Sequence, residues 1–413
     1  MELTRRRFLT TSGLSGIGLV AGLGAVGCRR RQVEPPPPDT VAGSPPLSLP
    51  EPVAPRSSGV PAVFSTIEAT GSPEDIGVAV GRATAERIRL CFGGQREWFD
   101  QLVAYVQADP ASRFDPFVAA IERHHPEVMA ELRGMARGAG VAERDLVVWN
   151  LQPELSAMMA GGLSTGCSTI HLNAGDRMLL AHNEDGHASY REHMVVLRLH
   201  PEGKPAVTCL AYPGLVPGQV PAVNEAGLMV STNYIATREV RHGVPRYVLG
   251  RAVLQAASID QAVTVATNRD RAFAFTLHVG STRERRLACL EVAPRVHDIV
   301  ETHGIFVHTN HLVLPGTRDV PQDVGDSTSS RYAVLTDAVR GVEGILGAVD
   351  EAVLVRLLAS HESRQPPYSP CRHPTSGTTG RTLATAVFDV RAGTFALYEG
   401  NPCEGRRRGV ELA

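Results

Sequence analysis

The stretch GCSTIHLNAGDRMLLAHNED, residues Gly166 to Asp185, decides how the rest of the chain can fold. Residues 168–172 alternate polar and apolar side chains, residues 173–176 have the composition of a turn, and residues 178–182 form a second, apolar run. Two short runs of this kind around a turn predict a β-hairpin.

The predicted hairpin gathers polar groups around a cysteine, because its second strand ends level with Cys167 when the turn is centred in the stretch. The period of two places Cys167 and Thr169 on one face of the first strand. It likewise places Asn183 and Asp185 together on the second, so we expect the four side chains to converge. A lone cysteine is usually a buried core residue, but Gly166 before it and the polar cluster opposite favour a nucleophile.

Two short motifs make the chain resemble a known family. Gly166-Cys167-Ser168-Thr169 followed by His182-Asn183-Glu184-Asp185 resembles the N-terminal-nucleophile (Ntn) hydrolases related to acyl-coenzyme A:6-aminopenicillanic acid acyltransferase, with choloylglycine hydrolases and acid ceramidase as more distant relatives. Further segments match the family in order: Glu131–Val141, Asn224–Leu228, His308–Leu312 and Thr385–Gly400. The resemblance implies an α+β fold, a four-layer αββα sandwich of two antiparallel sheets preceded by a helical pro-region.

The resemblance also implies that the precursor cleaves its own backbone between Gly166 and Cys167. Cys167 then becomes an N-terminal nucleophile, and its α-amino group, with a reference pKa of about 8, accepts the thiol proton. Asp185 would orient the resulting ammonium group. We therefore expect a helical chain, residues 61–166, and a strand-rich chain, residues 167–413, that stay associated after cleavage.

Other residues are candidates for binding and processing. In the family an Asn side chain and a backbone N–H bind the oxyanion; Asn310 matches the side chain, and the chain near Asn233 matches the backbone donor. Thr169 matches a hydroxyl residue that assists self-cleavage, Asn183 belongs to the polar cluster, and Arg331 is a candidate for binding a substrate carboxylate. We expect an N-acyl or acyl-thioester substrate whose acyl group forms a thioester on the nucleophile and passes to water or an amine.

A conventional cysteine protease with a distant His is possible, but it would not explain why the hairpin brings Asp185 to the cysteine. Two further alternatives remain open. The first is a metal-dependent hydrolase using His182, His187 and His193, although their spacing does not place two imidazoles on one helix face. The second is a non-catalytic exported binding protein with the same fold. It is disfavoured by the intact set of Gly166, Cys167, Thr169, Asp185 and Asn310.

The N-terminal sequence predicts export. Residues 1–27 contain Thr4-Arg5-Arg6-Arg7-Phe8-Leu9 and an uncharged small-residue segment, which is typical of a twin-arginine signal peptide. Ala25-Val26-Gly27-Cys28 also fits a lipoprotein processing site, so a periplasmic protein and one tethered through a lipidated Cys28 both remain open. Residues 28–60 are Pro-rich and predict a linker.

Composition excludes several functions. The net charge is −2 and no long basic run follows the signal, so we expect no nucleic-acid partner. The seven cysteines show no CxxC spacing, which argues against a zinc site and a disulfide scaffold, and we expect no cofactor. Aromatic residues make up 5% of the chain, which argues against a large stacking pocket.

The remaining patterns predict helices over about 72–159 and mainly hairpins after the first one. Helices should interrupt the strands at about 245–257, 258–268, 329–340 and 349–360, before a last hairpin at 385–398.

Overall fold

A computed structural model describes residues 64–159, 161, 166–404 and 406–413. The predicted signal segment 1–27, the linker up to residue 60, Cys28 and most of the approach to Gly166 lie outside the described residues. In the part of the chain that is described, no helix has the length and apolar character needed to cross a membrane.

The region before the hairpin begins with a strand and continues as helices. Ser72 caps the first helix: its side chain accepts from the Asp75 N–H, and the Asp75 side chain accepts from the Ser72 N–H, which is a capping box. Four of the later helices have a proline in their first turn, where the missing N–H costs nothing. The elements are β1 (Ser65–Gly71), α1 (Pro73–Gly94), α2 (Arg96–Ala108), α3 (Pro110–Arg113), α4 (Asp115–His124), α5 (Pro126–Ala139), α6 (Glu143–Asn150) and α7 (Gln152–Met158).

Helices α1 and α5 pack backbone against backbone. Gly77 and Gly81 of α1 face α5, and a Cβ on either would lie 2.1 or 2.2 Å from a carbonyl oxygen of that helix. Gly134 and Gly138 of α5 face α1 in the same way, at 2.2 Å. The absence of a side chain at these four positions is what allows the two helices to approach so closely.

Two β-sheets form the centre of the structure. One has eight strands in the order β1-β4-β5-β6-β7-β8-β9-β10, and the other has six in the order β11-β2-β3-β12-β13-β14. The strands after β1 are β2 (Gly166–Ala174), β3 (Arg177–His187), β4 (Val195–Pro201), β5 (Val207–Ala211), β6 (Ala222–Asn224), β7 (Leu228–Tyr234), β8 (Phe275–Ser281), β9 (Arg286–Val292), β10 (His297–Glu301), β11 (Gly304–His308), β12 (Gly380–Asp389), β13 (Thr394–Glu399) and β14 (Arg406–Gly409).

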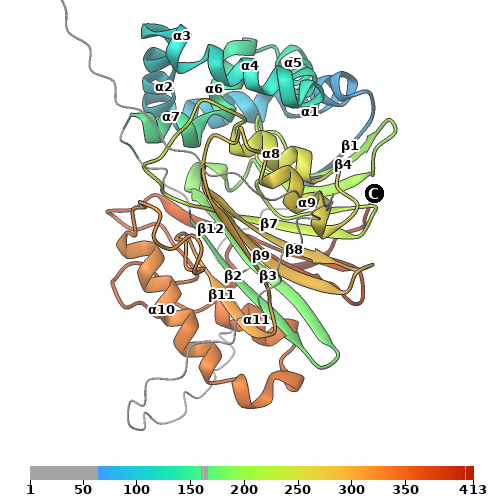
Figure 1. Cartoon of the computed structure of the whole chain (residues 1–413), viewed down its shortest axis with the longest axis vertical. Helices are drawn as coiled ribbons and strands as arrows, with labels where there is room; N and C mark the ends of the chain where they lie inside the picture. Colours follow the sequence, from blue (N-terminus) through green and yellow to red (C-terminus); the bar gives the residue numbers. More distant parts are fainter. Residues whose placement is uncertain (1–63, 160, 162–165, 405) are drawn as a thin grey trace, which may run out of the picture. The chain divides into compact units, whose positions relative to one another are not determined.

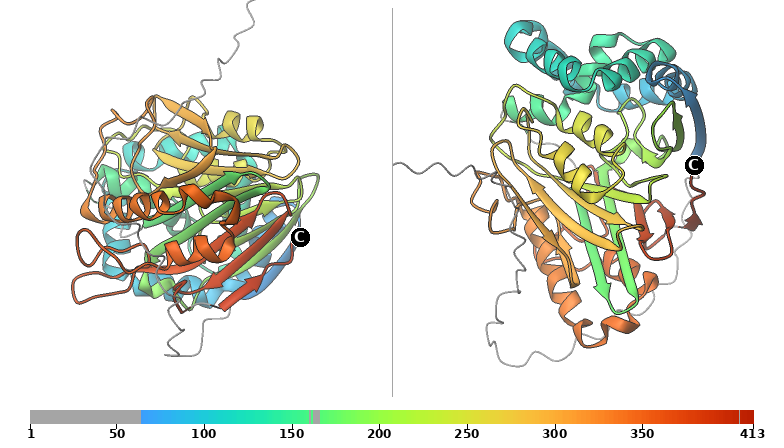
Figure 2. Two further views of the ribbon diagram at one scale, coloured as in Figure 1. Left: turned by 90° about the horizontal axis from the view of Figure 1, so that it is seen from below. Right: turned by 45° about the vertical axis from the view of Figure 1, so that its right-hand side comes forward.

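Helices cover the outer faces of both sheets, which gives the expected αββα sandwich (Figures 1 and 2). Helices α10 (Asp326–Arg340) and α11 (Glu351–Leu358) pack on the six-stranded sheet, and α8 (Arg246–Val253) and α9 (Ile259–Ala266) accompany the eight-stranded sheet. Alternation along β2 explains this placement, because Ile170 and Leu172 pack against α10 and α11, whereas the odd-numbered residues between them face the other sheet.

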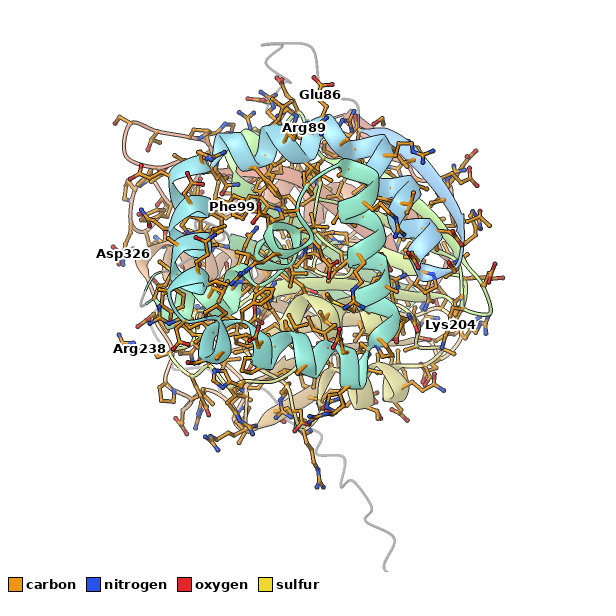
Figure 3. All side chains as sticks on the ribbon, turned by 90° about the horizontal axis from the view of Figure 1, so that it is seen from above. Glu86, Arg89, Phe99, Lys204, Arg238 and Asp326 are labelled. Atoms are coloured by element: carbon orange, nitrogen blue, oxygen red, sulfur yellow. The ribbon has the colours of Figure 1, made fainter. Side chains whose placement is uncertain are left out.

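The helices α1 to α7 form a further layer, seen from above in Figure 3. Phe99 lies inside this layer, where its ring meets Trp149 edge-on at 5.1 Å, whereas Glu86 and Arg89 lie at its rim. The layer also packs on the sandwich, because Trp149 contacts Tyr190, which follows β3 in the chain.

The region before Gly166 differs from its expected all-helical character. Strand β1 pairs in parallel with β4 and so forms an edge of the eight-stranded sheet. The sequence did not predict β1, because this half-exposed edge strand lacks the alternation of polar and apolar residues by which strands are recognised. The sequence does not mark the break between α6 and α7, which falls at Leu151, with Pro153 in the first turn of α7.

The close packing of α1 and α5 yields a stability prediction. Gly77→Ala should lower the free energy of unfolding by about 1–3 kcal/mol, since the new methyl group would overlap the Glu131 carbonyl oxygen. Urea denaturation measures this change. Gly93→Ala in the same helix is the control: no atom lies within 4 Å of its Cβ position, so it should stabilise by about 0.5–1 kcal/mol. If both substitutions changed the free energy of unfolding equally, the close contact between α1 and α5 would be contradicted.

Candidate active site

The β2–β3 hairpin places Cys167 directly opposite Glu184. Ala174 pairs with Arg177, so the turn contains only two residues, Gly175 and Asp176, and Gly175 has the positive φ of 57° that such turns need. A two-residue turn fixes the register of the whole hairpin, and directly opposite residues point to the same face.

This register corrects the expected grouping of side chains. Cys167 and Thr169 share a face with Glu184 and His182, whereas Asp185 and Asn183 point to the other face of the sheet. The expected convergence of Cys167, Thr169, Asn183 and Asp185 on one face is therefore wrong. The register lies within the range expected from the sequence, but a shift of one residue exchanges the two faces.

Glu184 is the carboxylate nearest the Cys167 sulfur. Its Oε2 lies 4.0 Å from Sγ, and its Oε1 accepts a 2.7 Å hydrogen bond from the Tyr212 hydroxyl. Burial raises the pKa of the Cys167 thiol well above its usual range, Glu184 and Asp185 raise it further, and Arg331 with the Asp185 backbone N–H opposes them. Burial also raises the pKa of Glu184, against the lowering effect of His182.

His182 and Glu184 are in hydrogen-bond contact beside the thiol. The Thr169 hydroxyl donates to Asn233 Oδ1 at 2.9 Å, so the 2.9 Å contact between Thr169 Oγ1 and His182 Nδ1 requires the hydrogen to be on Nδ1. His182 Nε2 lies 3.2 Å from Glu184 Oε2, and that bond needs one further proton on either group. With the proton on His182, Glu184 is a carboxylate that can accept a thiol proton or bind a cation.

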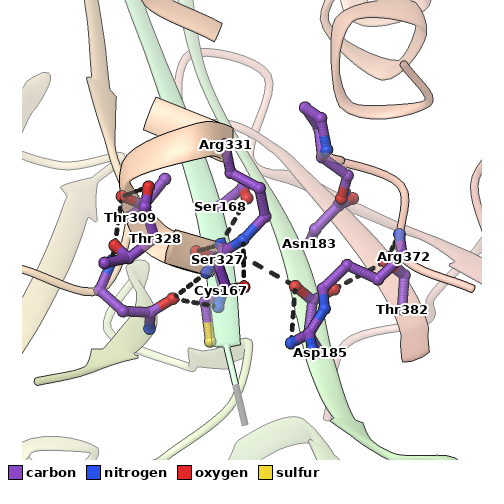
Figure 4. A network of polar contacts seen from close by, with 12 residues as sticks. Cys167, Ser168, Asn183, Asp185, Thr309, Ser327, Thr328, Arg331, Arg372 and Thr382 are labelled. Atoms are coloured by element: carbon purple, nitrogen blue, oxygen red, sulfur yellow. Dashed lines mark hydrogen bonds and ion pairs between the residues drawn. The ribbon is translucent and has the colours of Figure 1, made fainter. Parts of the chain in front are cut away.

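The backbone of Cys167 is held on both sides by side chains (Figure 4). Its N–H donates to Asn310 Oδ1 at 2.9 Å, and its carbonyl oxygen accepts from Arg331 Nη1 at 2.5 Å. Arg331 Nη2 also donates to Asn310 Oδ1 at 2.7 Å, so the two side chains that hold the Cys167 backbone are bonded to each other. Asn310 Nδ2 donates to the Tyr234 carbonyl oxygen at 2.9 Å, which uses one of its two N–H groups.

Asp185 is surrounded by positive charge on the face opposite the thiol. Its Oδ2 lies 3.9 Å from Arg331 and 4.0 Å from Arg372, and its Oδ1 accepts from the Thr382 hydroxyl at 2.7 Å. Burial raises the pKa of Asp185, and the two arginines oppose this. The two guanidinium groups therefore compensate the charge of Asp185 in the uncut chain, and the expectation that Asp185 orients a terminal ammonium group stays a prediction.

Arg331 and Asn183 have structural contacts. Arg331 is 1% exposed with its guanidinium group on the Cys167 backbone, so the expectation that it binds a substrate carboxylate is not supported by its position. Burial lowers the pKa of Arg331 to about 10. Asn183 Nδ2 donates to the carbonyl oxygens of Leu358 and Pro370, at 2.9 and 3.0 Å, and ties the end of α11 to the segment before β12.

Thr169 and Asn233 begin a chain of hydrogen bonds between the two sheets. Asn233 Nδ2 donates to the Thr309 carbonyl oxygen at 2.6 Å and lies 3.1 Å from His308 Nδ1. His308 Nε2 lies 3.0 Å from Glu291 Oε1, and both side chains are buried. Asn233 therefore contributes its side chain to the interface between the sheets, whereas its neighbours in β7, Thr232 and Tyr234, line the cavity at the thiol.

The thiol side of the sheet opens into a cavity of about 440 Å³ that both Cys167 and Glu184 line. Five aromatic residues contribute to its wall, from α2, α8, the end of β7 and the segments after β3 and β5: Trp98, Tyr190, Tyr212, Tyr234 and Tyr247. The expectation of no large aromatic pocket is therefore wrong, because a low overall aromatic content does not prevent the few aromatic residues from gathering at one site.

The three histidines of the metal alternative do not come together. His187 contacts Ser189, and among the described residues neither His187 nor His193 joins the group around His182. Cys167, His182 and Glu184 do offer three ligand atoms within 4.8 Å of one another. A metal hydrolase at this position would therefore use Cys167 as a metal ligand.

Comparison with known proteins identifies the family. The family model described as acyl-coenzyme A:6-aminopenicillanic acid acyl-transferase matches residues 172–404, which is more than half of the chain. The chain belongs to this family, and it is an Ntn-type hydrolase or acyltransferase that acts on amides. The matched range begins shortly after Cys167.

Individual relatives are more distant. The chain is 24% identical over 387 residues to the β-alanyl-dopamine/carcinine hydrolase of Drosophila melanogaster, covering 85% of this chain and 96% of that protein. Among solved structures, a variant of conjugated bile acid hydrolase from Clostridium perfringens has a TM-score of 0.40 at 10% identity, covering 60% of this chain and 97% of the other. Penicillin V acylase from Agrobacterium tumefaciens has a TM-score of 0.33 at 13% identity, covering 56% of this chain and 82% of the other.

Several residues of the site were not singled out from the sequence. Glu184 could have been found from the two-residue turn, which sets it opposite Cys167. Tyr212, Arg372 and the remaining aromatic residues of the cavity come from distant segments, and no local pattern marks them.

The position of Glu184 predicts the pH dependence of thiol reactivity. Glu184→Gln removes a negative charge that disfavours the thiolate, so the pKa of Cys167 should fall and the pH–rate profile of its alkylation by iodoacetamide should move to lower pH. Glu97→Gln, which changes another carboxylate of the cavity wall, is the control and should leave the profile in place. An identical midpoint in both variants would show that the Glu184 charge does not act on the thiol.

Proposed function

We propose that the chain is a self-processing cysteine amidohydrolase with Cys167 as its nucleophile. The observation that carries this proposal is the position of Cys167, whose backbone N–H and carbonyl are both held by side chains while its sulfur reaches a cavity of substrate size. In processing, the thiol would attack the carbonyl carbon of Gly166 and the amide nitrogen would leave as the new α-amino group of Cys167. Water would then hydrolyse the thioester and release residue 166 as a carboxylate.

The surroundings of Gly166 support cleavage at this bond. A Cβ at Gly166 would lie 3.0 Å from a guanidinium nitrogen of Arg331 and 3.0 Å from one of Arg372, so a side chain there would displace both. Two cations beside the peptide bond would stabilise negative charge that develops on its carbonyl oxygen. The same two arginines compensate Asp185, which gives that carboxylate the role of holding them in place.

Turnover would use the same thiol on an external amide. The α-amino group of Cys167 accepts the thiol proton and returns it to the leaving amine. Asn310 Oδ1, which accepts the Cys167 N–H in the intact chain, is positioned to hold that amino group. The second N–H of Asn310 Nδ2 is the side-chain donor for the oxyanion, and water completes hydrolysis of the acyl-thioester.

The cavity indicates a small amide that carries an aromatic group and a cation. Its aromatic wall suits an aromatic amine as the leaving group, by ring packing. Glu184, 4.0 Å from the sulfur, suits an amino group on the acyl chain. β-Alanyl-dopamine, which the name of the Drosophila relative gives as its substrate, has both features. We propose an N-aminoacyl amide of an aromatic amine as the substrate, with water as the acceptor.

The two chains formed by cleavage would stay together. Strand β1 forms part of the eight-stranded sheet, and the Phe64 N–H donates to Glu399 Oε1 at 3.1 Å, so the segment before Cys167 is bound at several places. We further propose export by the twin-arginine route to the periplasm or cell envelope, with Cys28 as the site of a lipid anchor where one is present.

Self-processing predicts a specific mass pattern. The purified protein should give two polypeptides by denaturing mass spectrometry, the second beginning at Cys167, that elute together in gel filtration. Cys167→Ala should remain one polypeptide without turnover, because no thiol is present to attack residue 166. Cys91→Ala, at a buried cysteine of α1, is the control and should be processed. A fully active, uncut chain would refute self-processing, and an uncut chain without turnover would favour the non-catalytic binding protein.

The proposed substrate class is tested by three amides. N-β-Alanyl-dopamine should be hydrolysed with a higher kcat/KM than N-acetyl-dopamine, which lacks the amino group, or N-β-alanyl-methylamide, which lacks the ring. Glu184→Gln should lower kcat/KM for N-β-alanyl-dopamine by roughly 10- to 100-fold, which corresponds to the loss of one charged hydrogen bond. The same substitution should change kcat/KM for N-acetyl-dopamine much less. Equal loss for both dopamine amides would assign Glu184 to the reaction itself and refute its role in binding the acyl chain.

A further inference from the structure

Four side chains that suit a metal ion converge near the C-terminus, away from the Cys167 cavity. They are His361, Cys371, His373 and Cys403, and their four ligand atoms all lie within 4.8 Å of one another. None of them lines the cavity at the thiol.

The distances among these atoms approach those of a tetrahedral zinc site. Bond lengths of about 2.3 Å for Zn–S and about 2.0–2.1 Å for Zn–N give tetrahedral edges of about 3.8 Å for S···S, about 3.6 Å for S···N and about 3.3 Å for N···N. Cys371 Sγ lies 3.5 Å from Cys403 Sγ, and His373 Nε2 lies 3.5 and 3.4 Å from these two sulfurs. The two imidazole nitrogens, of His361 and His373, are 3.2 Å apart.

Three separate segments bring the ligands together. His361 follows the end of α11, Cys371 and His373 lie in the segment before β12, and Cys403 follows β13. The sequence contains no CxxC pair, and this argued against a zinc site. That argument applies only to ligands close together in the sequence, whereas these ligands come from separate segments. Nine residues separate His361 from Cys371, and twenty-nine separate His373 from Cys403, which no local motif describes.

The surrounding residues orient the ligands. The Cys371 N–H donates to the Ser360 carbonyl oxygen at 2.9 Å, which joins its segment to the end of α11. Asn401 Nδ2 donates to Cys371 Sγ at 3.3 Å and to the Arg372 carbonyl oxygen at 2.6 Å, which joins it to the segment after β13. An N–H donated to a ligating sulfur is a usual outer contact of thiolate metal sites.

We propose that His361, Cys371, His373 and Cys403 bind one Zn²⁺ ion as a closed, tetrahedral structural site. Two thiolates and two imidazoles form a ligand set that zinc favours, and four protein ligands leave no coordination position for substrate. The inference does not rest on the proposed reaction.

The ion would fix the segment that carries Arg372. This residue lies between two of the ligands, its N–H donates to the Thr382 hydroxyl at 2.9 Å, and its guanidinium group lies 4.0 Å from Asp185. The Asn183 contact to Pro370 fixes the same segment from β3. Zinc would therefore hold a positively charged residue of the Gly166–Cys167 region from outside the cavity.

The test measures metal in the purified full chain. After dialysis against metal-free buffer, elemental mass spectrometry should find about one zinc per chain. Cys371→Ser and Cys403→Ser should lose the zinc, whereas Cys167→Ala and Cys91→Ala should keep it. The Cys167→Ala control distinguishes this site from one formed by Cys167, His182 and Glu184. A strong chelator should lower the melting temperature of the parent protein but not lower it further in the Cys371→Ser variant.

A second measurement covers the case in which the cysteine variants do not fold. Reconstitution of the parent protein with Co²⁺ should give the visible absorption of a tetrahedral ion and a near-ultraviolet thiolate band. His361→Ala removes an exposed ligand at little structural cost. It should weaken both the visible absorption and the near-ultraviolet thiolate band. The proposal would be overturned by a parent protein without zinc and with a Cys371–Cys403 disulfide, seen as a mass lower by two hydrogen atoms. Loss of zinc in Cys167→Ala, or zinc retained in all the ligand variants, would overturn it as well.

Discussion

The pairing of Cys167 with Glu184 across β2 and β3 determines on which face of the hairpin each of its polar side chains lies. A two-residue turn leaves the hairpin no other register, and the period of two then separates two sets of side chains. One set faces the cavity and the other sheet, where Glu184 and His182 surround the thiol. The other set faces the arginines that hold the Cys167 backbone from behind.

This separation also sorts the charges of the site. The arginines and Asp185 lie close together on one face and compensate one another, which a buried charge requires. The thiol face has His182 and Glu184, whose Nε2 and Oε2 atoms lie 3.2 Å apart. Burial keeps the pKa of the Cys167 thiol high in the intact chain, although the charge of Arg331 on the other face of the sheet opposes this.

The sequence was sufficient for features that depend on local chemistry. The hairpin, the helix beginning at Ser72 and the αββα fold follow from turn residues, caps, periodicity and the family resemblance, and the structure confirms them. Features that depend on distant segments were missed, such as the aromatic wall and the partner strand of β1. The predicted grouping of Cys167 and Thr169 with Asn183 and Asp185 was wrong for a different reason. An error of one residue in the register of the hairpin is enough to exchange the side chains on its two faces.

The two ends of the described fold lie next to each other. Arg408 donates to the Phe64 carbonyl oxygen and to the Thr66 hydroxyl, both at 2.7 Å, and the Ala413 N–H donates to Thr208 on the same sheet. A short peptide could therefore join these ends, and the chain could be reopened between Gly166 and Cys167 without changing a contact of the sandwich. After removal of its initiator methionine, such a circular permutant would begin at Cys167 without any self-cleavage, so the proposed processing step and the proposed turnover could be studied separately.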